Sequence, residues 1–107
     1  KSVLSIIVIV SDLKYSDALS VIIKQLIRSV TSVAANYRAV CRARSEKEKY
    51  AKLCIVVEEA DETLFWIEML IDGGFITEEK LSALRNESEE ILKVMSSYRS
   101  KLKPINH

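Results

Sequence analysis

Four basic residues share one face of a predicted helix and could bind the phosphates of a nucleic acid. On a helical wheel they fall within an arc of about 80°, and they are Lys24, Arg28, Arg38 and Arg42. At about 1.5 Å per residue this basic stripe would be about 27 Å long, enough for several backbone phosphates. A merely solvated face would explain the same pattern. So would ion pairs with acidic residues of the next helix, which are Glu58, Glu59, Asp61 and Glu62.

The chain offers little for catalysis or metal binding. Its single histidine is the last residue, His107, so neither a Ser-His-Asp nor a Cys-His arrangement can be assembled with confidence. No paired Glu-x-x-His motif is present, and Gly73 and Gly74 do not form a phosphate loop. Cys41 and Cys54 lie in apolar periodic segments, where we expect buried, reduced thiols. We expect a non-enzymatic protein without metal, cofactor or small-molecule substrate.

Composition predicts one small domain that spans residues 1–107. The 107 residues are 49% hydrophobic and 29% charged, enough for a core and unlike a disordered chain. Two Gly and one Pro leave few turns for a β sandwich or barrel. The longest uncharged run, residues 2–11, is shorter than the roughly 20 residues of a membrane span, and it lacks a signal-peptide cleavage site. We expect a cytoplasmic protein with no membrane partner.

The net charge of +1 hides an asymmetry along the chain. Residues 1–45 carry seven Lys and Arg against two acids, whereas residues 46–107 carry nine against thirteen. Basic and acidic helices that pair within one bundle would explain this division. A basic face that binds a polyanion would explain it equally well.

The sequence predicts four helices, over residues 2–13, 17–44, 46–72 and 78–102, and periodicity and capping residues indicate the last three. The first segment is rich in β-branched residues, but a single strand would have no partner elsewhere in the chain. Ser45 and Glu48 form a capping box before the third helix, and Gly73 and Gly74 can end it. Thr77 precedes the fourth helix. Short connections favour an all-α, antiparallel up-down-up-down four-helix bundle.

The faces of these helices predict the core and a self-association surface. The core face of the second helix holds Leu26, Val30, Val33, Tyr37 and Val40. A neighbouring face carries small residues that allow close helix contact, namely Ser29, Ser32, Asn36, Ala39 and Ala43. The third helix is apolar on two sides, which one small bundle has little room to bury. We expect an oligomer interface at Ile55, Trp66 and Met69.

A long spaced pattern in the second and third helices is similar to that of a known family. It begins with residues 25–38, QLIRSVTSVAANYR, and continues through Cys41, Arg42, Ala43, Ser45, Lys52, Leu53, Ile55, Glu59, Ala60, Glu62, Thr63 and Trp66. This pattern resembles the four-helix-bundle proteins encoded in bacterial 23S rRNA intervening sequences, over about residues 20–102. The family tends to have Gly where Ala34 stands, often Glu at Ala39 and an aromatic at Lys49.

The resemblance implies an antiparallel four-helix bundle that commonly assembles as a ring-like homopentamer, with RNA binding suspected. It also implies a likeness to the accessory protein of diversity-generating retroelements. The first functional hypothesis is therefore an oligomer whose basic stripe binds RNA or DNA. The alternative is a protein-interaction scaffold or accessory protein with no nucleic-acid contact, which the near-neutral net charge favours.

Overall fold

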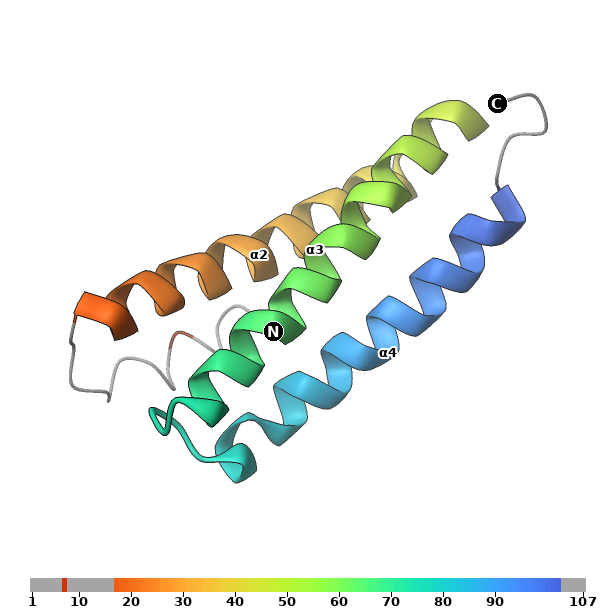
Figure 1. Ribbon diagram of the computed structural model, residues 1–107. Helices are drawn as coiled ribbons and strands as arrows, with labels where there is room; N and C mark the ends of the chain where they lie inside the picture. Colours follow the sequence, from red (N-terminus) through yellow and green to blue (C-terminus); the bar gives the residue numbers. More distant parts are fainter. Residues whose placement is uncertain (1–6, 8–16, 103–107) are drawn as a thin grey trace.

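The computed structural model describes residue 7 and residues 17–102, and the latter form three long helices (Figure 1). These are α2, Asp17–Cys41; α3, Glu46–Asp72; and α4, Glu78–Leu102. Within these residues there is no strand. The prediction of an all-α protein is confirmed.

The predicted four-helix bundle is wrong for the structure as described, because three helices are present and not four. Apart from Ile7, the predicted helix over residues 2–13 lies outside the described residues. Its prediction rests on excluding an unpaired strand, in a segment whose β-branched residues have low helix propensity, and on no helical periodicity.

The other predicted helix boundaries agree closely with the structure. Those of α3 and α4 match, whereas α2 ends at Cys41 rather than at residue 44. After Cys41 the backbone tightens, since the amide of Ala43 donates to the carbonyl of Val40, three residues back, at 3.2 Å. The basic-stripe residue Arg42 therefore lies just beyond the helix.

The ends of α3 are fixed by a serine cap and two glycines. Ser45 Oγ accepts a hydrogen bond from the Glu48 amide at 3.1 Å, as the predicted capping box requires. The Glu48 carboxylate accepts from the amide of Arg44, one residue earlier than in the usual box. At the other end Gly74 has a φ of 77°, whereas Gly73 is right-handed at −77°. The left-handed turn therefore rests on Gly74.

The helix α3 lies between α2 and α4, and consecutive helices run antiparallel (Figure 1). It packs against both neighbours, while the backbones of α2 and α4 do not approach within 8 Å of each other. The molecule is elongated, with extents of 49 × 22 × 19 Å. The α2–α3 turn and the C-terminus of α4 lie at one end, and the α3–α4 turn and the N-terminus of α2 lie at the other.

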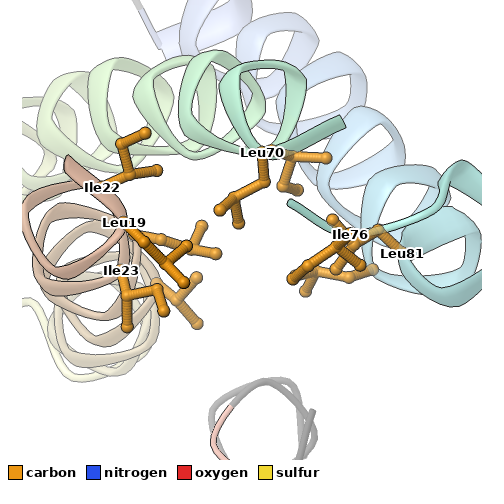
Figure 2. Close-up of a cluster of buried hydrophobic side chains, with 10 residues drawn as sticks. Leu19, Ile22, Ile23, Leu70, Ile76 and Leu81 are labelled. Carbon is orange, nitrogen blue, oxygen red and sulfur yellow. The ribbon is translucent and has the colours of Figure 1, made fainter. Parts of the chain in front are cut away.

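Each end has its own apolar cluster. At the α3–α4 turn, Leu19, Ile22 and Ile23 of α2 face Leu70 of α3, with Ile76 and Leu81 alongside (Figure 2). At the α2–α3 turn the cluster is smaller. Its buried members are Val40, Leu53 and Val56, surrounded by half-buried side chains of α2 and α4.

The predicted core face of α2 is largely confirmed. Leu26, Val30 and Val40 are buried, and Val33 is half-buried. Tyr37 is the exception at 48% exposed, because it borders the open space between α2 and α4.

The predicted small-residue contact is confirmed at Ser29. This residue is fully buried, and its hydroxyl lies 3.0 Å from that of Thr63 on α3.

Candidate nucleic-acid interface

The four residues of the basic stripe are all exposed, but they do not form one continuous cationic surface. Arg38 and Arg42 lie one turn apart at the C-terminal end of α2. Lys24 lies fourteen residues before Arg38, about 21 Å along the helix. Arg28 stands between them, and its contacts decide whether the stripe is continuous.

Arg28 is held by acidic residues of α3. Its Nη1 lies 3.2 Å from a carboxylate oxygen of Glu59, and its Nη2 pairs with Glu62. Its Nε donates to Gln25 Oε1 at 3.0 Å. Every nitrogen of the guanidinium thus has a protein partner. For Arg28, the structure therefore confirms the explanation by ion pairs with acidic residues of the next helix.

Trp66 completes this charged cluster from α3. Its Nε1 donates a hydrogen bond to Glu62 Oε2 at 3.0 Å. This bond, followed by the one from Arg28, lowers the pKa of Glu62. The hydrogen bond to Glu62 in turn raises the pKa of Arg28. One cation shared by two carboxylates leaves a local net charge of −1, so this part of α2 repels rather than attracts a phosphate.

The remaining stripe residues have no such partners. Within residues 17–102, the ion pairs involve Arg28 and Arg85, and neither Lys24, Arg38 nor Arg42 takes part in one. Arg38 and Arg42 are therefore the pair of stripe cations that lie close together and remain available to a ligand.

The three residues of the predicted oligomer interface are spread along α3. Ile55 and Trp66 are half-buried, and Met69 is 40% exposed. Ile55 lies eleven residues before Trp66, about 16 Å away along α3. The structure adds Phe65, 50% exposed, whose ring meets that of Trp66 edge-on at 4.8 Å. Phe65 and Met69 are four residues apart, a spacing that places them on one face of a helix, so the sequence could have revealed this apolar pair.

An apolar groove of about 380 Å³ opens between α2 and α4. Its floor includes Ala60 and Thr63 of α3, and its walls include Tyr37 of α2 and Val94 of α4. Tyr37 and Val94 are each more than 40% exposed there. Sequence reasoning missed this groove because a complete four-helix bundle would have covered it.

Neither metal nor thiol chemistry stands out in the part of the chain that is described. No three His, Cys, Asp or Glu side chains of those residues lie together in a way that could hold an ion. Cys54 is half-buried, and Cys41 is exposed rather than buried as predicted, because α2 ends at that residue.

By length and composition alone, α2 could cross a membrane, with a third of the relevant window buried. Core helices pass the same test, and Leu19, Leu26 and Ser29 of α2 are buried against the rest of the structure.

Comparison with known proteins identifies a family. The model of the 23S rRNA-intervening sequence protein family matches residues 1–97. A crystal structure of a protein of unknown function from the S23 ribosomal protein family of Bacteroides thetaiotaomicron VPI-5482 superposes with a TM-score of 0.70. The two sequences are 40% identical over 75% of this chain and 71% of that one. No curated protein matches this chain.

Proposed function

Because the chain belongs to the 23S rRNA-intervening sequence protein family, we propose that it is a non-enzymatic, cytoplasmic oligomer that binds RNA or other nucleic acid. One observation carries this proposal. Arg38 and Arg42 are exposed one turn apart, and no acidic residue within positions 17–102 neutralises either of them. Arginine forms bidentate bonds with phosphate oxygens, and such contacts do not depend on the base sequence.

Self-association would turn a weak site into a useful one. Two or three phosphate contacts per copy give little affinity at physiological salt. A homopentamer, which the resemblance implies, would present five such sites on one particle and gain from their effective concentration. We propose that the exposed Phe65 and Met69, next to Trp66, form part of the contact between copies.

Light scattering tests the assembly. Phe65→Glu with Met69→Glu should dissociate the oligomer while leaving the helical content intact, because both side chains are exposed in the single chain. A wild-type protein that is monomeric at micromolar concentration would exclude the oligomer.

A salt titration tests the nucleic-acid function. Wild-type protein is titrated against a fluorescent mixed-sequence RNA and a DNA of the same length, at several salt concentrations. Affinity should fall steeply with salt. Arg38→Glu should weaken binding to both ligands, while Lys80→Glu, an exposed residue near the start of α4, serves as the charge-matched control. If the wild-type protein binds neither ligand at low salt, the function is wrong.

The second candidate is a scaffold that contacts protein and not nucleic acid. The apolar groove between α2 and α4 favours it, because exposed apolar surface of this kind often marks a protein contact. The same salt titration distinguishes the two candidate functions, since a scaffold should show no salt-dependent binding to RNA or to DNA.

A further inference from the structure

The charges of the molecule are divided between its two ends. Residues 36–54 and 93–102, which form the α2–α3 turn end, carry nine Lys and Arg against two Glu, a net of +7. The rest of the described helices, residues 17–35 and 55–92, carries four Lys and Arg against twelve acids, a net of −8. We call the first set the basic end. Its cations are Arg38, Arg42, Arg44, Lys47, Lys49, Lys52, Lys93, Arg99 and Lys101.

The fold brings these cations together from three separate parts of the chain. Val40 of α2, Leu53 of α3 and Tyr98 of α4 belong to one apolar cluster, so the three helix ends that carry the cations are neighbours. The pKa of Tyr50 reflects the same arrangement of the helix ends. Burial raises it, and the positive charge of Arg99 acts in the opposite direction, so Arg99 of α4 lies near the start of α3.

The cations of the basic end are not used for internal ion pairs. The ion pairs in which both partners lie within residues 17–102 involve Arg28 or Arg85, both of which lie outside the basic end. Glu48, one of the two acids at this end, accepts a hydrogen bond from the backbone of Arg44 and caps α3. Six of the nine cations of the basic end are exposed, whereas Lys49, Lys52 and Arg99 are half-buried.

Helix capping explains only part of this distribution. Basic residues in the last turns of α2 and α4, such as Arg38 and Lys101, interact favourably with the negative ends of the helix dipoles. Lys47 and Lys49 are different, because they lie in or next to the first turn of α3, where the dipole disfavours a cation. A local net charge of +7 in nearly unpaired side chains also destabilises the folded state through repulsion. A polyanionic ligand would offset that cost.

We propose that nucleic acid binds across the basic end, on cations of all three helices, rather than along the face of α2. This inference rests on the proposed function and changes its site. Arg38 and Arg42 belong to both surfaces, whereas Lys47 and Lys101 belong only to the basic end and Lys24 only to the stripe. The ligand is recognised by its phosphate backbone, so RNA and DNA should both bind.

Two charge-matched double variants separate the two surfaces. Lys47→Glu with Lys101→Glu changes the basic end, and Lys24→Glu with Lys80→Glu makes the same change in net charge elsewhere. All four side chains are exposed, so both proteins should fold, and circular dichroism with a thermal scan verifies this. Affinity is measured for the mixed-sequence RNA and DNA by fluorescence anisotropy over a range of salt concentrations.

The basic-end variant should lose at least tenfold in affinity, and its log–log salt slope should fall by about two, one for each lost phosphate contact. The control should lose no more than about twofold. An equal or larger loss in the control overturns the inference, because net charge or the stripe would then govern binding. The affinity of the basic-end variant could instead be unchanged while Arg38→Glu still weakens binding. That result would support the proposed function and contradict this inference.

Two further results would also be decisive. If the wild-type protein binds no nucleic acid at low salt, both the proposed function and this inference are wrong. If the Lys47 and Lys101 changes instead abolish a salt-sensitive association between copies and leave RNA binding intact, the basic end binds the acidic part of another copy. The inference is then overturned.

Discussion

The two ends of the molecule differ in packing as well as in charge. The α3–α4 turn end contains the larger apolar cluster, with ten buried residues from the three helices and the turn itself, and both ion-paired arginines lie outside the basic end. The basic end has three buried apolar residues, a fringe of half-buried ones and no ion pair. One end is thus built mainly for stability, and the other leaves its charges available to a ligand. This division is typical of proteins that position binding residues on a stable scaffold.

The comparison predicts that equal truncations cost more at the larger cluster. Leu70 and Leu53 are both fully buried, one in each cluster. Leu→Ala substitutions in cores cost about 2–5 kcal/mol, depending on how far the site can relax. Leu70→Ala should fall in the upper part of this range. Leu53→Ala should fall in the lower part, because its half-buried neighbours can move. The measurement is the free energy of unfolding from urea denaturation.

An equal or larger loss for Leu53→Ala would show that the basic end is as tightly packed as the other. The two ends would then contribute equally to the free energy of unfolding, and they would differ only in charge.

The α3–α4 turn should be sensitive to both of its glycines, for different reasons. Gly74→Ala places a Cβ in left-handed backbone at a φ of 77°, which costs about 1–2 kcal/mol although the space around it is open. At Gly73 a Cβ would lie 2.9 Å from the Met69 carbonyl oxygen and 2.8 Å from the Phe75 ring, so Gly73→Ala should destabilise through a steric clash. Thermal unfolding of both variants tests this. A neutral Gly74→Ala would exclude the left-handed turn.

The Arg28 cluster should make a small, pH-dependent contribution to stability. The pKa of Glu62 is lowered in the folded protein by the hydrogen bond from Trp66 and the pair with Arg28. Its contribution is therefore present above its ordinary pKa of 4.5 and is lost as the pH falls through the lower folded value. Because Arg28 is 45% exposed, solvent screening keeps the effect below about 1 kcal/mol.

Glu62→Gln keeps an oxygen that can accept from Trp66 and removes the charge. Urea denaturation between neutral pH and pH 3 should show a smaller loss of stability in the variant than in the wild type. Parallel curves would mean that the pair with Arg28 contributes nothing.

Sequence reasoning succeeded where the signal was local. The bounds of α3 and α4 follow from Ser45, the two glycines and Thr77, because capping groups act within a single turn. The alignment of the basic-stripe residues on one face also follows from the sequence, since a helical wheel needs only the local period, whereas the exposure of that face does not follow from it. No local signal decides whether Arg28 is available to a ligand or pairs with acidic residues, because Glu59 and Glu62 lie 31 and 34 residues away.

What the sequence could not supply depended on how the helices are arranged in space. The predicted helix over residues 2–13 rests on the absence of a partner strand and not on a local helical signal, and the described structure has three helices. Tyr37 belongs to the periodic apolar face of α2 that predicts the core, yet it borders an open groove. The basic end was also missed, because its cations are divided among α2, α3 and α4, and only the antiparallel packing brings them to one place.

Mapping the contact with RNA residue by residue tests the central claim most directly. Amide chemical shifts of ¹⁵N-labelled protein are followed by NMR during titration with a short mixed-sequence RNA at low salt. The account predicts that the changes gather in residues 38–52 and 97–102, while residues 66–80 at the α3–α4 turn stay unchanged. Changes that follow the outer face of α2 from Lys24 onward, or that gather at the α3–α4 turn, would contradict it.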